Sequence, residues 1–208
     1  YIDLFKSQIY HRENDFTQDM VRSAIKLARQ VNLPSSYGNL YLALAFAYTS
    51  SGENHKAIDY GRMAFDYWKT TSDSVNAVRS AYIVGTAYRH LGSDYDLDDA
   101  DRWLARAEEL LPKNAESTLQ VALLAERGNF LIYRQDYGMA VKLFARALKI
   151  TNKIGDAMRT AILQHSMGIA LIWEEKYDAG REYLNDSLAY WEAQESAPQV
   201  GHLLHTIG

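Results

Sequence analysis

The sequence predicts an all-α fold, an α-solenoid of tandem antiparallel helix pairs with five repeats plus one extra helix. The main observation is a small residue that recurs along the 208-residue chain at intervals of 40, 43, 40 and 40 residues. The members of this series, which we call the small positions, are Ala45, Gly85, Gly128, Gly168 and Gly208. A period of about 20 to 50 residues is typical of solenoids, in which each unit buries its apolar face against its neighbours.

The residues around each small position predict the first helix of a pair. Apolar side chains stand five residues and one residue before the small position, and three residues after it, in most copies. Around Gly168 these side chains are Leu163, Met167 and Leu171. Spacings of three and four residues place them on one face of a helix, as an apolar stripe. The chain has only three prolines, which leaves room for long helices.

A second helix is predicted after each first helix, beyond a short turn. Its small or apolar markers are Ala57, Gly61 and Ala64, then Ala100, Leu104 and Ala107, then Ala140, Phe144 and Ala147, then Gly180, Leu184 and Ser187. The turns are predicted at 51–53, 91–93, 135–137 and 175–177, with a weaker copy at 14–16. The three extra residues of the 43-residue interval are assigned to an acidic loop at 93–98.

These markers predict a single repeat domain over residues 1–208. The repeats are approximately 1–35, 36–73, 74–114, 115–155 and 156–196, followed by a partial repeat at 197–208. The chain begins at Tyr1 rather than Met, and both ends are predicted to be helical, so we interpret it as a piece of a longer protein. The apolar residues Leu203, Leu204 and Ile207 then predict self-association through the C-terminal helix.

Composition excludes several classes of protein. The formal net charge is -4 and the sequence pI is near 5.9, so direct contact with nucleic acid, which needs a basic excess, is not expected. The chain has no cysteine, no apolar run of membrane-spanning length and no signal peptide. We therefore predict a cytoplasmic protein without membrane contact. No catalytic motif is present, so no enzyme activity and no cofactor are predicted.

The alternation of small and large residues, together with the turns, resembles the tetratricopeptide repeat (TPR). The match is clearest in 81–91 with 100–112 and in 164–188. The 40-residue form is similar to the repeats of bacterial maltose-regulator-like transcription activators, of peptide-sensing regulators and of polarity and motor adaptors. The resemblance implies a right-handed superhelix whose first helices line a concave face. It also implies a non-catalytic module that binds a protein or peptide; the alternative is a small-ligand-sensing domain of a bacterial transcription regulator.

One face of the first helices predicts the binding site. It holds the residues six and three before each small position, and one, four and five after it. None of the residues at these places is acidic, although the chain has 26 acidic residues, so the expected partner has acidic and apolar residues side by side. The candidate partner-binding residues are Arg79, Tyr82, Arg89, His90, Asn129, Tyr133, His165 and Trp173.

The resemblance also argues against one kind of partner. Chaperone-binding members of the family grip a terminal carboxylate with Lys, Asn and Arg side chains from successive first helices. The matching places here hold Leu42, Phe46, Ile83, Ala122 and Glu126. Binding to the tails of heat-shock chaperones is therefore not expected.

The sequence offers two interpretations for each of two candidate metal sites and for the side chain of Arg127. The acidic run 94–99 resembles the start of a calcium loop but lacks its glycine and its final glutamate, so helix-capping aspartates are the preferred interpretation. His165, His202 and His205 offer a zinc set, against the simpler interpretation of polar groove residues. Arg127 interrupts the apolar stripe, either with a packed stem and a paired head or as a fork for a ligand carboxylate or phosphate.

Overall fold

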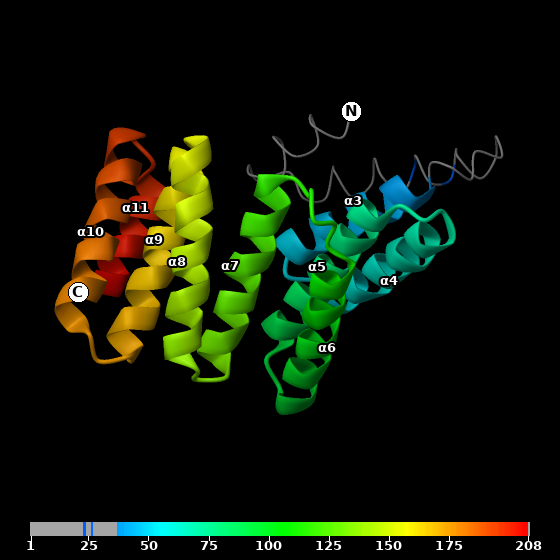
Figure 1. Cartoon of the computed structure of the whole chain (residues 1–208), viewed down its shortest axis with the longest axis horizontal. Coiled ribbons are helices and arrows are strands. Elements are labelled where there is room, and N and C mark those ends of the chain that lie inside the picture. The colour runs from blue at the N-terminus through cyan, green and yellow to red at the C-terminus, as the bar shows by residue number, and fades with distance from the viewer. Residues whose placement is uncertain (1–22, 24–25, 27–36, 208) are drawn as a thin grey trace. The chain divides into compact units, whose positions relative to one another are not determined.

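The computed structural model describes residues 23, 26 and 37–207, and the elements found in these residues are all helices (Figure 1). The predicted first repeat, 1–35, and its turn at 14–16 lie outside the described residues apart from 23 and 26. The chain divides into two compact units, residues 1–114 (unit 1) and residues 115–208 (unit 2). The division coincides with the predicted boundary between the third and fourth repeats.

The described part of unit 1 contains two helix pairs. The bounds are Tyr37–Ser50 for α3, Asn54–Thr70 for α4, Ser74–Leu91 for α5 and Asp94–Leu110 for α6. Each helix packs against the next one in the chain, and the two first helices, α3 and α5, are also in contact. The predicted alternation of first and second helices is thus confirmed in this unit.

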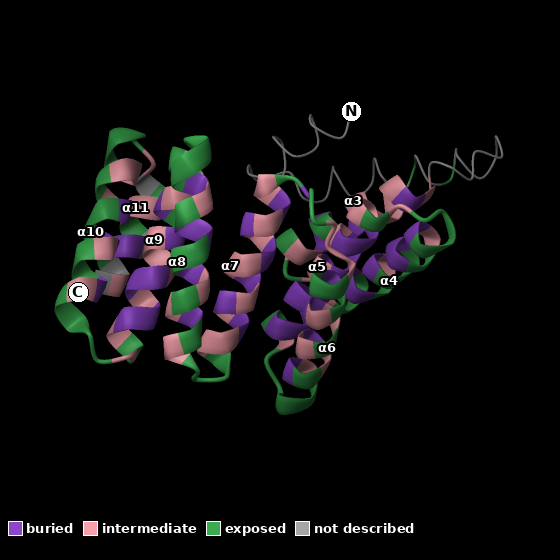
Figure 2. Ribbon diagram, in the orientation of Figure 1, coloured by how far each residue is buried: buried purple, intermediate pink, exposed green. Residues whose placement is uncertain are grey.

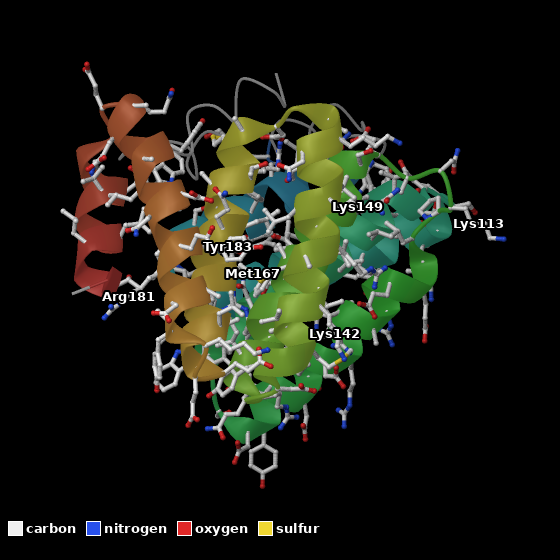
Figure 3. All side chains as sticks on the ribbon, turned by 60° about the vertical axis from the view of Figure 1, so that its left-hand side comes forward. Lys113, Lys142, Lys149, Met167, Arg181 and Tyr183 are labelled. Carbon is white, nitrogen blue, oxygen red and sulfur yellow. The ribbon has the colours of Figure 1, made fainter. Side chains whose placement is uncertain are left out.

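Unit 2 contains two further helix pairs and an extra helix. The bounds are Ser117–Tyr133 for α7, Tyr137–Ile154 for α8, Ala157–Trp173 for α9, Tyr177–Ala193 for α10 and Ala197–Ile207 for α11. Its buried core contains Phe144, Leu163 and Met167, and Tyr183 of α10 packs against this cluster (Met167 and Tyr183 are labelled in Figure 3). Figure 2 colours the buried residues of these helices purple. The core therefore contains predicted stripe and marker residues, together with Val121 and Leu148, which the pattern did not predict.

Three of the small positions, Gly85, Gly128 and Gly168, are confirmed as points of close helix contact, whereas Gly208 lies outside the described residues. A Cβ atom on Gly85 would lie 2.8 Å from Cγ of Leu104, and one on Gly128 would lie 2.6 Å from a ring carbon of Phe144. A Cβ on Gly168 would lie 2.7 Å from Cγ of Leu184 and 2.8 Å from the backbone oxygen of Gly180. Since such distances are shorter than van der Waals contact, any larger side chain must displace its neighbour.

The prediction of an acidic loop at 93–98 is wrong, because this segment is helical from Asp94 onward. Ser93 is the N-cap and accepts a hydrogen bond from the backbone N–H of Asp96. The packing partner of Gly85 is Leu104, 19 residues later, whereas Gly168 packs on Leu184, 16 residues later. The three extra residues thus extend the start of α6 by about one helical turn. Acidic side chains favour this position because the N-terminal end of a helix is positive.

The end of the chain also differs from expectation. Leu203 is buried, with 2% of its surface exposed, because α11 packs against α10. Leu204 is 53% exposed, while the side chain of Ile207 lies outside the described residues. The prediction that all three residues form an exposed apolar surface is therefore wrong, because Leu203 is buried. In the described ranges, no helix is both long and apolar enough to cross a lipid bilayer.

Candidate functional site

The unit 1 part of the predicted binding face lies on α3 and α5. Arg79 and Tyr82 are half-buried and His90 is exposed, all on α5. Phe46 of α3 is 39% exposed. The Arg79 guanidinium donates to Oδ1 of Asn76 at 3.3 Å. Three of the predicted candidates and one aromatic side chain are thus accessible in this unit.

Arg89 does not lie open on this face as expected, because only 7% of its surface is exposed. Its Nη2 lies 3.0 Å from Nε2 of His90, and since a guanidinium only donates, the imidazole nitrogen accepts. A buried guanidinium needs such partners, because burial without them would be costly. Charge reversal at Arg89 is therefore expected to destabilise the fold as well as to change the charge of this face.

The hydroxyl groups on the unit 1 face bond within their own helices. Thr49 Oγ1 donates to the backbone oxygen of Ala45 at 2.9 Å, and Thr86 Oγ1 donates to that of Tyr82 at 3.0 Å. These bonds occupy the hydroxyl protons. These two threonines are therefore not available to donate a hydrogen bond to a partner.

The unit 2 part of the face lies on α7 and α9 and presents exposed aromatic and apolar groups. Trp173 is 60% exposed, Tyr133 51% and Ile162 41%. The Trp173 ring stacks on Tyr137 of α8, with centroids 6.1 Å apart and planes inclined by 16°. Stacking holds the indole in place while one region of it stays accessible, which is the character of an aromatic anchor in an interface.

Several apolar residues predicted to line this face instead contribute to packing. Ala125 and Ile132 pack against the core cluster of unit 2. Ile172 contacts α10, since a Cβ atom on Gly180 would lie 2.7 Å from its Cγ1 atom. The apolar part of the accessible face is therefore narrower than the sequence predicts.

The remaining candidates are only partly described. Asn129 and His165 are half-buried, and the side chains of His202 and His205 lie outside the described residues, so the zinc set is untested. The guanidinium carbon of Arg127 lies 5.2 Å from the centroid of the Phe130 ring, a cation–π contact. This contact supports the interpretation that the Arg127 side chain packs against its own helix.

A cation–aromatic cluster on α4, α5 and α6 was not predicted from the sequence. Arg62 Nη2 donates to the Tyr88 hydroxyl at 2.8 Å, and its guanidinium lies 5.8 Å from the Trp103 ring centroid. Arg106 lies 4.8 Å from the same ring, which packs edge-on against Phe65. Burial raises the pKa of the Tyr88 phenol, against the opposing effect of the Arg62 charge. The cluster joins second helices of neighbouring repeats, and no local spacing in the sequence indicates it.

Similarity to solved structures agrees with this architecture. BtubC (BKLC) from P. vanneervenii matches with a TM-score of 0.71 at 13% identity, over 95% of this chain and 82% of that chain. A putative kinesin light chain from Podosopora anserina, described by its nearly identical TPR-like repeats, matches with a TM-score of 0.68 at 16% identity, over 94% and 95%. The apo form of RapI matches with a TM-score of 0.66 at 16% identity, and this chain covers 91% of its own length but 52% of RapI.

No protein-family model matches the sequence, and no curated protein matches it either. At these identities the structural similarity establishes the fold alone. The chain thus has the fold of a TPR-type helical repeat.

Proposed function

We propose that the chain is a non-catalytic module of a larger regulatory or scaffold protein that binds a peptide or protein on its first helices. The observation that supports this proposal most directly is Trp173, an indole that is 60% exposed yet stacked on Tyr137. Exposing a large aromatic ring to water is unfavourable, and such rings are enriched among the residues that dominate binding energy. In unit 1 the corresponding helices offer the basic and polar groups Arg79, Tyr82 and His90.

A selected peptide ligand tests this function. Peptides are selected from a random displayed library on the whole chain, and their affinity is measured by fluorescence polarisation. Trp173→Ala is expected to weaken binding by at least ~1 kcal/mol, about fivefold. Met63→Ala, at an exposed residue of the second helix α4, is the matched control and should change affinity little. If the selected peptides bind Trp173→Ala and Met63→Ala equally well, the binding surface lies elsewhere on the chain.

Arg79 provides the electrostatic test of the unit 1 face, because Arg89 is buried. Because Arg79 is half-buried rather than buried, Arg79→Glu is expected to slow association with an acidic peptide and to leave the helical content unchanged. Association rates at two salt concentrations, measured by stopped flow, separate this steering effect from a loss of contact. An unchanged rate at low salt would remove Arg79 from the site.

Small-ligand sensing is the second candidate function, and one cavity favours it. The cavity in unit 2 has a volume of about 280 Å³ and is lined by Thr151, Thr160, Gln164 and Tyr190, among others. Its size is slightly below the usual range of ligand pockets, which begins at about 300 Å³. A metabolite that raises the melting temperature, and that loses this effect in Gln164→Ala, would favour the sensor over the peptide-binding module.

A further inference from the structure

The second helix α8 carries a one-sided basic stripe. Its 18 residues include four basic side chains and no acidic one. The four stand at i, i+4, i+7 and i+11, a spacing that places them along one face. They are Lys142, Arg146, Lys149 and Lys153.

All four side chains are exposed, and Lys142 and Lys149 project from α8 in Figure 3. Among the residues that the structure describes, no carboxylate lies within ion-pair distance of any of them. The contact of the Lys142 ammonium is with the sulfur of Met139, at 3.8 Å. Like charges three and four residues apart repel one another along a helix, and α8 supplies nothing that offsets the repulsion.

Two of the other second helices are acidic, and one is mixed. The sequence of α6 contains seven acidic residues and two arginines, and that of α10 contains Asp178, Glu182, Asp186 and Glu192 against Arg181. The sequence of α4 contains three basic and two acidic residues. Among the described second helices, α8 is therefore the one that has basic residues without acidic ones. Neither the core nor the turns of unit 2 require this exception, since all four basic side chains point away from the core.

We propose that the α8 stripe docks an acidic helical segment of a partner protein, independently of the face formed by the first helices. The stripe is one side chain wide and, at 1.5 Å per residue, about 16 Å long, which matches three turns of a single helix. Carboxylates at the same spacing on the partner face all four basic groups at once. This complementarity sets the register and speeds association.

The surroundings of the stripe favour a narrow protein partner over a broad anionic one. Helix α10 packs against the same α9 as α8 does, and its acidic residues Asp178, Glu182 and Asp186 are exposed. A flat anionic bilayer or a nucleic-acid duplex would be repelled by these carboxylates, whereas a single helix along α8 avoids them. The four stripe positions also include no aromatic side chain on which bases could stack.

A synthetic helical peptide tests the proposal. The probe is a fluorescent 18-residue peptide with Glu at i, i+4, i+7 and i+11, and binding is followed by polarisation at about 20 mM and about 300 mM salt, between which charge screening increases strongly. Lys142→Glu with Lys149→Glu should weaken binding at least tenfold at low salt. The matched control, Lys176→Glu with Arg181→Glu, makes the same change in net charge off the stripe and should weaken it less than threefold. Circular dichroism verifies that both variants fold.

Other outcomes would overturn the proposal. If the two double variants lose the same affinity, net charge alone attracts the probe. The same conclusion follows if a peptide of the same composition, with its acidic residues spread around the helix, binds equally well. Tighter α8-dependent binding of a 20-nucleotide single strand or of phosphatidylserine vesicles would identify a different occupant. Self-association that depends on Lys142 and Lys149 in sedimentation would identify a second copy of this chain. Trp173→Ala should bind the acidic peptide normally, which keeps this test separate from that of the proposed function.

Discussion

The third and fourth repeats, one in each unit, differ in which helix of the pair is basic. In the third repeat, in unit 1, the basic groups Arg79, Arg89 and His90 lie on the first helix α5, and the second helix α6 is mainly acidic. In the fourth repeat, in unit 2, the second helix α8 has four basic residues and no acidic one, while the first helix α7 has one of each. The small positions and turns are shared by both units. The repeat therefore constrains close helix contacts and leaves the chemistry of the exposed faces free to vary.

The largest expected effect comes from the small positions. A larger side chain at these positions should lower the free energy of unfolding in both units. Gly168→Leu should lower the free energy of unfolding by about 3 kcal/mol or more, because its Cβ would meet the backbone oxygen of Gly180, which cannot rotate away. Gly85→Leu should cost about 1–3 kcal/mol, because its nearest neighbour is the movable side chain of Leu104. Urea unfolding followed by circular dichroism measures both.

A helical glycine without close neighbours provides the control. Among the described residues, and apart from its chain neighbours and the backbone of α11 itself, no atom lies within 4 Å of a Cβ built on Gly201. Gly201→Ala should leave stability unchanged or raise it by up to about 1 kcal/mol, as helix propensity requires. If Gly168→Leu were tolerated as well as Gly201→Ala, the shared register of the two units would be wrong.

The next largest effect is a difference in stability between variants of Arg89 and Arg79, the two arginines of the unit 1 face. Arg89→Glu should lower the free energy of unfolding by about 2 kcal/mol or more, because it places a carboxylate where a buried guanidinium was held. Arg79→Glu, at a half-buried position, should stay within about 0.5 kcal/mol of the native chain. Thermal and urea unfolding of both variants measure the difference, and similar stabilities would show that Arg89 is accessible after all.

Equivalent helix caps allow a finer comparison. Asp73 in unit 1 and Asp156 in unit 2 each accept a hydrogen bond from the backbone N–H three residues later, at 3.0 Å. The other carboxylate oxygen of Asp73 accepts from the neutral Asn76 amide, whereas that of Asp156 accepts from the Arg159 guanidinium. Asp156→Asn should therefore cost about 0.5 kcal/mol more than Asp73→Asn at neutral pH.

The pH dependence of the Asp156 effect has a definite sign. Burial alone would raise the pKa of Asp156, but the hydrogen bonds from Arg159 and its charge lower it below the ordinary value of 3.8. A lowered pKa in the folded state adds stability above the ordinary value, and this stability is lost as the pH falls through the folded value. The difference between the native chain and Asp156→Asn should thus shrink below about pH 4, as measured by urea unfolding across pH. A difference that is constant with pH would contradict the role of the charge.

The sequence predicted the parts of the molecule that depend on local spacing. The small positions, the turns and the second-helix markers follow from residues within one repeat. The helical form of the segment at 93–98 was missed because a run of aspartates is as typical of a loop as of a helix start. The burial of Arg89 and the packing of Ile172 were missed because they depend on neighbouring helices, which a face assigned by position cannot include. The α8 stripe is visible in the sequence as four basic residues without an acidic one, but the predicted binding face included positions on the first helices only.

The smallest expected effect concerns Trp173, the aromatic anchor of unit 2. In unit 1 the equivalent position is occupied by His90. A double-mutant cycle of Tyr137→Ala and Trp173→Ala should give a coupling energy of about 0.5 kcal/mol, at the low end for aromatic pairs because Trp173 is largely exposed. A control cycle pairs Trp173→Ala with Met158→Ala, an exposed residue about 22 Å away along α9, and should be additive. If the first cycle were additive too, the stack would not hold the indole. The loss of peptide affinity in Trp173→Ala would then reflect direct contact alone, and Tyr137→Ala should leave that affinity unchanged.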